Sequence, residues 1–400
     1  KMTEQAASME KLHQNSEDED NFIPYYAIVA GVNGDGYNTG SGKPSGAHVM
    51  NGVSGFGISK SGNSPWFAIF EDGTALCGTN NTDWDEAVKA HGDAVEAIGG
   101  FQLVRKNGVD IPFGSAESGP SSYLDNGRYP RSFVGVTSDN KVVFMAVDGN
   151  GSGGSAGTNY AESLELMKEQ DCTYILCLDG GGSATYISRP EGSNSIEVTS
   201  DPSDGSERAV SNGLVMYTTT PPSDVFEKAI VTAENYYVTP GSKVAISAVG
   251  VSPAGSAAEI PENAEWSATN GNIEEGVFIS DGTIGTATVS VAVDGVEVGS
   301  TEINVVLPDT ISFNRESTTV PYGGTIKLEV SAKYGLNTVV LQESDITFTI
   351  DNENAGRQVY FDYGREIPVK PEVVAKFKET TVKGSQFKQP LLEFSGACAG

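Results

Sequence analysis

The residues best suited to chemistry stand together in residues 173–188, TYILCLDGGGSATYIS. An apolar run ends there in Asp179, three glycines follow (Gly180, Gly181 and Gly182), and Ser183 precedes a second apolar run. A buried strand that delivers a carboxylate onto a backbone without side chains can bring main-chain N–H groups close to a ligand. The same pattern also fits a plain glycine-rich hairpin turn, so the local sequence leaves both interpretations open.

A second carboxylate, Asp148, follows the apolar run at residues 142–147 and also precedes a glycine. Two carboxylates at neighbouring strand ends could carry out acid–base or nucleophilic chemistry at a sugar. They could equally hold a metal ion or cap turns, because Asp-Gly is a common turn sequence. No ligand set with firm spacing is apparent, although calcium or magnesium is conceivable.

The arginines are the candidate anion ligands, because a fork-shaped cation suits a phosphate or a carboxylate. For Arg128 we expect a surface pair with one of the many acids. For Arg131, which follows Pro130 at a strand entrance, a structural role and ligand binding are both open. The arginines in the first 219 residues are Arg105, Arg128, Arg131, Arg189 and Arg208.

Several catalytic devices are excluded by the residues present. The three histidines, His13, His48 and His91, stand neither in a glycine-rich turn nor in an HExxH pattern. A Ser-His-Asp triad centred on Ser183 would need one of them brought close, and we do not expect one. GGGS is not the G-x-S-x-G elbow, and the phosphate loop G-x-x-x-x-G-K-[ST] is absent.

The elements that would position these residues follow from hydrophobic periodicity and turn residues. Asn159 is a suitable N-cap, and Glu162 three residues later completes a capping-box pattern. Helices are expected at residues 3–16, 84–91 and 159–170. Strands are expected at residues 23–32, 66–70, 94–104, 133–137, 142–147, 173–178, 184–187 and 208–217, with 133–137 and 142–147 forming a hairpin.

The composition changes at residues 218–222, TTTPP, which are typical of a linker. Short strands at regular spacing then predict an immunoglobulin-like β-sandwich over residues 220–306, with Trp266 in its core. A weak internal repeat predicts a second such module over residues 307–365. Residues 366–400 would begin a further, incomplete segment.

Length and charge restrict the class of protein. The 400 residues are too many for a single core, so two to four domains are expected. The net charge of −28 would repel phosphate backbones, so we expect no nucleic-acid partner. There is no apolar run long enough for a transmembrane helix and no signal sequence; we expect that both ends are trimmed.

The four cysteines form no CxxC pair, which argues against a zinc ribbon or a thioredoxin-type motif. Cys172 and Cys177 lie five residues apart, too far along a strand to bridge directly. We therefore expect two buried free thiols at these positions. Cysteine usage does not decide the cellular compartment.

Several segments together resemble the phosphodiester glycosidase domain family, to which the lysosomal uncovering enzyme belongs. The resemblance covers residues 1–219 and rests on GVNGDGYN, YPRSFVGVTSDN, AVDGNG, LDGGGSAT and ERAVSNGLVMY in that order. It implies an α+β catalytic domain, a mixed β-sheet with packed helices, ahead of the all-β modules. It also implies hydrolysis of a sugar 1-phosphodiester at the glycosidic bond, on extracellular or cell-surface glycans.

The resemblance assigns expected roles to named residues. The catalytic set would be Asp179, Arg131 and Asp148, with Asp179 stabilising the oxocarbenium-like centre, attacking it or activating water. The glycine N–H groups with Arg131 and Arg208 would hold the phosphate. The substrate-binding set would be Asn33, Asp35, Gly180, Gly181, Gly182, Ser183, Arg208 and Asn212.

Two departures from the family stand out. One or two strands that usually precede the first helix are missing, and Ser132 stands where threonine is more usual. A non-catalytic surface module that binds anionic glycans, and a phosphodiesterase that cleaves the P–O bond, remain the alternatives. Attachment to a cell wall or surface through missing terminal segments is conceivable.

Overall fold

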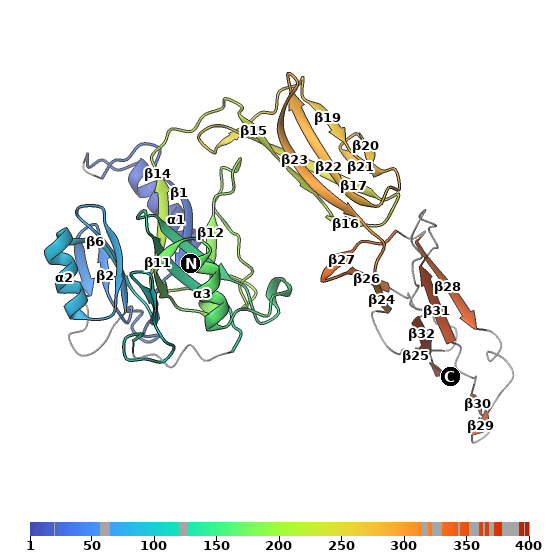
Figure 1. Ribbon diagram of the computed structural model, residues 1–400, viewed down its shortest axis with the longest axis horizontal. Coiled ribbons are helices and arrows are strands. Elements are labelled where there is room, and N and C mark those ends of the chain that lie inside the picture. Colours follow the sequence, from blue (N-terminus) through green and yellow to red (C-terminus); the bar gives the residue numbers. More distant parts are fainter. Residues whose placement is uncertain are drawn as a thin grey trace. The chain divides into compact units, whose positions relative to one another are not determined.

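The computed structural model describes residues 1–19, 21–56, 65–119, 127–313, 319–321, 330–342, 345–351, 360–362, 365–367, 372–377, 392–395 and 397–399. The chain divides into two compact units, Lys1–Pro222 and Ser223–Gly400 (Figure 1). The first contains the described helices and three sheets, and the described part of the second is built of strands. The predicted boundaries at residues 306 and 365 stay predictions.

The first unit holds three antiparallel sheets. One has the order β13-β12-β1-β14, the second β10-β9-β11-β7-β8, and the third β3-β2-β6-β4-β5. The strands are β1 Ala27–Asn33, β2 His48–Met50, β3 Val53–Phe56, β4 Trp66–Phe70, β5 Ala75–Gly78, β6 Ala94–Gly99, β7 Gln102–Lys106, β8 Val109–Asp110, β9 Arg131–Thr137, β10 Val142–Val147, β11 Cys172–Cys177, β12 Tyr186–Ser188, β13 Glu197–Val198 and β14 Gly213–Thr218.

The expected mixed sheet is wrong, because every strand pair described in this unit is antiparallel. A parallel pair needs a long crossover connection, whereas here turns and short loops link many consecutive strands. The expectation of an α+β domain followed by all-β modules holds only in part, because the protein is mostly β with few helices in its described part. The helices are α1 Met2–Gln14, α2 Asn81–His91 and α3 Tyr160–Lys168.

The three sheets share one buried core. Val32 of β1, Phe67 of β4 and Leu176 of β11 each come from a different sheet, and all are almost fully buried in one cluster. Helix α2 covers the outer face of the sheet with β4, where Ala87 packs near Trp66. Because the core joins all three sheets, the loops between them are held in fixed relative positions.

Local signals predicted several elements well. The hairpin of β9 and β10 is present, with Val142 opposite Val136. Helix α3 begins with the predicted capping box: the Asn159 side chain accepts from the Glu162 N–H, and the Glu162 side chain accepts from the Asn159 N–H. Both are short-range features that flanking residues determine.

Residues 173–188 do not form a hairpin. Strand β11 pairs with β9 and β7, whereas β12 pairs with β1 and β13 in another sheet. The glycines at 180–182 therefore lie where the chain crosses from one sheet to the next, and the short 3-10 turn Gly181–Ser183 makes the crossing. This placement excludes the plain-hairpin interpretation.

The second unit begins with a two-sheet β-sandwich. Its sheets have the orders β15-β17-β21-β20, with β18 beside β17, and β16-β23-β22-β19. The strands are β15 Lys228–Ala233, β16 Tyr237–Val238, β17 Lys243–Val251, β18 Ala257–Ala258, β19 Glu265–Ala268, β20 Gly271–Glu274, β21 Val277–Ser280, β22 Gly285–Val293 and β23 Val296–Val305. Val231, Phe278 and Val289 lie in the core between the sheets.

Trp266 is not in this core, and the prediction that placed it there was wrong. Its residue is 38% exposed, because it lies on β19 at the edge of its sheet. Phe278, which is fully buried, is the large aromatic residue of the core. Strand periodicity alone does not tell an edge strand from a central one.

The described strands after the sandwich are β24 Thr310–Phe313, β25 Thr319–Pro321, β26 Val330–Tyr334, β27 Asn337–Val339, β28 Ile346–Asp351, β29 Tyr360–Asp362, β30 Arg365–Ile367, β31 Glu372–Phe377, β32 Leu392–Ser395 and β33 Ala397–Ala399. Val306 and Ile311 join Ala332 and Val339 in a small cluster next to the sandwich. No helix in the described residues has the length and apolar content needed to cross a bilayer.

Cys172 and Cys177 are buried free thiols, as predicted, and Cys77 is a third. Burial raises the pKa of Cys172 to about 11 and that of Cys177 to about 12. These thiols are therefore protonated at neutral pH and act as small apolar core residues.

Candidate functional site

Asn33, the last residue of β1, joins the two sheets that meet at the site. It is fully buried; its Oδ1 accepts from the Ser132 hydroxyl (2.6 Å) and the Thr185 N–H (3.0 Å). Its Nδ2 donates to the Asp179 carbonyl (2.7 Å), and the Asp179 N–H donates to the carbonyl of Gly34 (2.9 Å). The buried Asn33 amide thus positions Asp179, and its contacts are with the chain itself.

Asp35 follows two residues later and is only 3% exposed. Burial raises the pKa of Asp35 to about 6, and the charge of Asp179 adds to the rise. Hydrogen bonds from the N–H groups of Gly46, Gly36 and Ser45 act in the opposite direction and do not cancel it. Asp35 therefore keeps its proton well above the usual range of an aspartic acid.

Asp179 lies at the end of the run that continues β11, and it is partly buried. Burial raises its pKa too, but three groups favour the ionised form: the Ser183 hydroxyl, the Gly180 N–H and the charge of Arg208. Asp179 and Asp35 thus form a carboxyl pair with different surroundings. Burial is the main cause of the raised pKa in both carboxyls, and of the two only Asp179 has a cation that offsets it.

The glycines of the crossing have individual tasks. The Gly180 N–H bonds the Asp179 carboxylate, and the Gly181 N–H donates to the Pro130 carbonyl (2.9 Å). Gly181 has a φ of 59°, in the left-handed region that glycine adopts without strain. Among the described residues, Gly182 is the member of the three whose N–H has no acceptor.

Arg208 lies directly against Gly182. Its Nε and Nη2 donate to Oδ2 of Asp204 (2.9 and 2.6 Å), and its Nη1 donates to the Ser183 hydroxyl (3.3 Å). A Cβ atom on Gly182 would lie 2.3 Å from Arg208 Nη2 and 2.3 Å from Asp204 Oδ1. Residue 182 must therefore be glycine for the ion pair to rest on the main chain.

Asn212 connects the segment before β14 to the same place. Its Oδ1 accepts from the Asp35 N–H (3.0 Å), and its carbonyl accepts from the Gly34 N–H (3.0 Å). Its Nδ2 is buried and has no acceptor among the described residues, and the buried Thr185 Oγ1 likewise has no partner there. Buried polar atoms without partners are rare, and at a site they suit a ligand.

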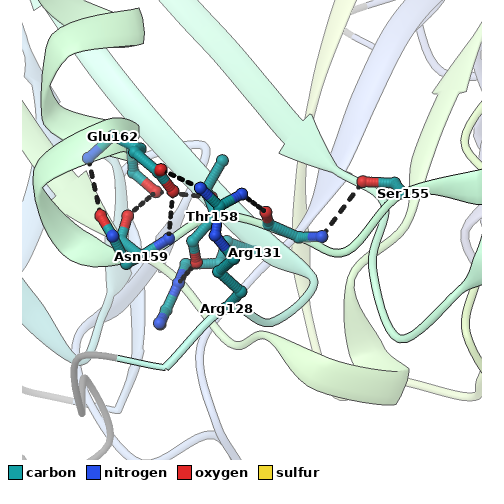
Figure 2. A network of polar contacts seen from close by, with 8 residues as sticks. Arg128, Arg131, Ser155, Thr158, Asn159 and Glu162 are labelled. Atoms are coloured by element: carbon teal, nitrogen blue, oxygen red, sulfur yellow. Dashed lines mark hydrogen bonds and ion pairs between the residues drawn. The ribbon is translucent and has the colours of Figure 1, made fainter. Parts of the chain in front are cut away.

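Arg131 belongs to a different network, shown in Figure 2. Its residue is 5% exposed; its Nε donates to the Thr158 carbonyl (2.8 Å) and its Nη2 to the Gly127 carbonyl (2.8 Å). In the same network Arg128 forms an ion pair with Glu162, the surface pair expected of it. These contacts give Arg131 a structural role in holding the loop ahead of α3.

Asp148 stands at the end of β10, beside a cavity of about 290 Å³. The cavity is lined by residues 144–146 and by Asp148, Tyr186, Thr199 and Ser200. One carboxylate oxygen of Asp148 accepts from the Asp201 N–H (2.8 Å). Asp148 therefore has a turn-holding contact, which was one of the roles left open for it.

The structure brings together most of the predicted site. One set of linked contacts includes Asn33, Asp35, Asp179, Gly180, Gly181, Gly182, Ser183, Arg208 and Asn212. Arg131 and Asp148 make their described side-chain contacts elsewhere, at carbonyls and at the Asp201 N–H. Their predicted catalytic roles have no support from these contacts.

Sequence reasoning missed Asp204. The residue lies in a turn whose Gly205 N–H donates to the Pro202 carbonyl (2.8 Å), in the motif DPSDGSER. The Pro, Gly and acid pattern signalled a turn, but the spacing of four to Arg208 is informative only within a helix, and this segment is not one.

The described residues contain no group of three or more metal-ligating side chains.

Comparisons with known proteins bear on the first unit. Residues 26–217 match the NAGPA phosphodiester glycosidase family. A similar solved structure is the zebrafish N-acetylglucosamine-1-phosphodiester alpha-N-acetylglucosaminidase catalytic domain, auto-inhibited by its pro-peptide. It is 22% identical with a TM-score of 0.36, over 50% of this chain and 66% of that chain. The adhesin FdeC of Escherichia coli is 11% identical with a TM-score of 0.21, over 70% of this chain and 99% of that chain.

A curated relative matches only a short stretch. Pyruvate:ferredoxin oxidoreductase of Moorella thermoacetica is 47% identical over 51 residues, which is 13% of this chain and 4% of that protein. The chain thus spans a very small part of the curated relative and less than two thirds of the zebrafish chain. The family match and the motifs that carry it agree: this chain contains, at residues 26–217, a domain of the phosphodiester glycosidase family.

Proposed function

We propose that the first unit hydrolyses a sugar 1-phosphodiester at its glycosidic bond, releasing a sugar and a phosphomonoester. The observation that carries this proposal is the carboxyl pair Asp35 and Asp179 beside the Arg208 guanidinium. Most enzymes that hydrolyse glycosidic bonds use a pair of carboxyl groups, and a guanidinium beside glycine N–H groups can bind a phosphate. The family match to residues 26–217 supports the same reaction class.

The bond changes assign a task to each carboxyl. A water oxygen forms a bond to the anomeric carbon while the bond from that carbon to the phosphate oxygen breaks. The electron pair of the broken bond leaves with the phosphate, which needs little protonation because a phosphomonoester is a good leaving group. Asp179, whose ionised form is favoured by the Ser183 hydroxyl, the Gly180 N–H and Arg208, stabilises the developing positive charge and accepts the proton of the water. Asp35 is protonated below a pH of about 6, and in that range its charge does not compete with the phosphate.

The phosphate is held by Arg208 and the Gly182 N–H. The N–H groups of Gly180 and Gly181 already have partners in the chain. Of the three glycine donors expected for the phosphate, only that of Gly182 is therefore left. We call the proposed phosphate-binding position at Arg208 and Gly182 the anion seat. The Ser183 hydroxyl contacts both Arg208 and Asp179, and so it fixes the distance between this seat and the Asp179 carboxylate. Ser183 thus positions groups, and no histidine is needed to activate it.

The sugar is bound by two of the buried polar atoms that have no partner among the described residues, Asn212 Nδ2 and Thr185 Oγ1. Both can exchange hydrogen bonds with ring hydroxyls or with an N-acetyl group. Asn33 moves from the expected sugar-binding set to a positioning role, because its amide bonds Ser132, Thr185 and Asp179. N-acetylglucosamine is the proposed sugar.

The test is hydrolysis of an N-acetylglucosamine 1-phosphodiester by the wild-type chain and by Asp179→Asn. We expect the variant to lose about a hundredfold or more in kcat, because groups that act on transition-state charge typically contribute that much. Asp139→Asn, an exposed acid on the β9–β10 turn, is the matched control and keeps full activity. Full activity in a correctly folded Asp179→Asn would remove Asp179 from the mechanism.

Tight binding of the phosphodiester without any product would instead favour the non-catalytic glycan-binding alternative.

We further propose action outside the cell or at its surface, with the all-β modules as a spacer. Protease treatment of intact cells of the source organism tests this location, since an external protein is cleaved and an internal one is protected.

A further inference from the structure

The Asp204 carboxylate is paired with Arg208, the arginine that the proposed reaction needs in order to bind the phosphate. Arg208 gives two of its N–H groups to one oxygen of Asp204, and the other oxygen faces Gly182. The turn at Gly205 holds Asp204 in that place. A carboxylate thus stands beside Gly182 and Arg208, where the phosphate is expected.

The charged groups around the anion seat influence which anion binds there. Arg208 contributes one positive charge and Asp204 one negative charge, and the Asp179 carboxyl lies beside them. A phosphodiester carries one negative charge at neutral pH, whereas a phosphomonoester carries about 1.5 to 2. The second charge of the monoester adds repulsion from Asp204 that the diester meets less strongly.

We propose that Asp204 is a specificity-determining residue, which makes the seat select a phosphodiester monoanion over a phosphomonoester dianion. The inference rests on the proposed function in one respect: the monoester is the product of that reaction. Asp204 then limits product inhibition, because the product gains charge as it is released from the sugar. A purely structural role for Asp204 would orient Arg208 without discriminating between the two anions.

The test is calorimetric binding of dimethyl phosphate and of methyl phosphate, a matched diester and monoester, to the full chain at pH 7. Wild type binds the diester in preference to the monoester. Asp204→Asn tightens the monoester by about three- to tenfold more than the diester, the size expected for one partly exposed charge. Asp204→Glu, which keeps the charge, preserves the preference of the wild type.

Repeating the titrations at pH 5 separates charge from shape. Methyl phosphate has a second pKa near 6, so at pH 5 it is largely a monoanion and the effect of Asp204→Asn disappears. Asp35 and Asp179 also change the charge of the site between these pH values. They are present in both proteins, so the comparison of variant with wild type at each pH removes their contribution.

Asp201→Asn is the matched control, since Asp201 is an exposed acid three residues earlier whose carboxylate lies near Gly153. It leaves the diester-to-monoester ratio unchanged. Three results would each overturn the proposal. They are an equal diester-to-monoester ratio in wild type and Asp204→Asn at pH 7, an effect of Asp204→Asn that is as large at pH 5 as at pH 7, and the same effect in Asp201→Asn. Binding needs no turnover, so a chain that binds selectively but hydrolyses no phosphodiester refutes the proposed function and leaves this inference standing.

Discussion

At the scale of single residues, burial distinguishes the two carboxyls. Asp35 is almost fully enclosed, and its Oδ2 lies so close to Gly46 and Gly99 that a Cβ atom on either would lie within 3 Å of it. Asp179 is more open and has a hydroxyl, an N–H group and a guanidinium near its charge. Burial thus raises the pKa of both acids, and of the two only Asp179 has a cation beside it; buried carboxyls with perturbed pKa values are expected at reacting sites.

The raised pKa of Asp35 makes stability depend on pH. Its pKa is 3.8 in the unfolded chain and about 6 in the folded one. Its stabilising contribution is therefore fully present below pH 3.8 and is lost as the pH rises through about 6. We expect Asp35→Asn to increase the free energy of unfolding at pH 7 by about 1 to 3 kcal/mol and to leave it nearly unchanged at pH 4.

Urea unfolding followed by fluorescence measures this effect at both pH values. Asp201→Asn controls for the loss of one negative charge from the same unit. An Asp35→Asn variant whose stability changes by the same amount at pH 4 and pH 7 would show that Asp35 does not carry a buried proton.

Much of the site's membership could be predicted from sequence, but its division of tasks could not. Asp179, Gly182, Arg208 and Asn212 stand in motifs, and the structure brings them together. The burial of Asp35 and the contact of Asp204 with Arg208 depend on segments far apart in the chain, such as residues 34–46 and 204–212. Spacing along the sequence carries no information about such contacts.

At the scale of elements, the site depends on two strands from different sheets that end side by side. Strand β1 ends at Asn33, and the β11 run ends at Asp179, with the Asn33 amide between them. Local signals predicted these strands, because apolar runs bounded by turn residues are short-range features. Their membership of separate sheets was not predictable, because pairing partners are set by long-range packing.

Helix α3 packs against β11 and carries the best-defined local signal in the chain. Asn159→Ala removes its N-cap and should lower the free energy of unfolding by about 1 kcal/mol, the usual cost of a lost cap. Activity per folded molecule should be unchanged, because Asn159 contacts Glu162 and not the carboxyl pair. Thermal unfolding and an assay at low temperature measure the two quantities.

Asn194→Ala, at an exposed loop position, is the control for this substitution and should leave the melting temperature unchanged. A loss of activity in Asn159→Ala at a temperature where the protein is fully folded would contradict the account. It would mean that α3 acts on the site directly and not through stability.

At the scale of the whole molecule, the chain divides into two units with separate cores. The carboxyl pair, Arg208 and the family match all lie within Lys1–Pro222. The change of composition at residues 218–222 predicted a boundary near this position. The exposed Trp266 shows the limit of such reasoning, since a regular strand rhythm does not specify which strand lies at a sheet edge.

The central claim is that water attacks the sugar carbon and not the phosphorus. Hydrolysis of an N-acetylglucosamine 1-phosphodiester in water enriched in heavy oxygen, with the products analysed by mass spectrometry, tests it directly. The account predicts label at the anomeric oxygen of the released sugar and none in the phosphomonoester. Label in the phosphomonoester would contradict it and would make the protein a phosphodiesterase that cleaves the P–O bond.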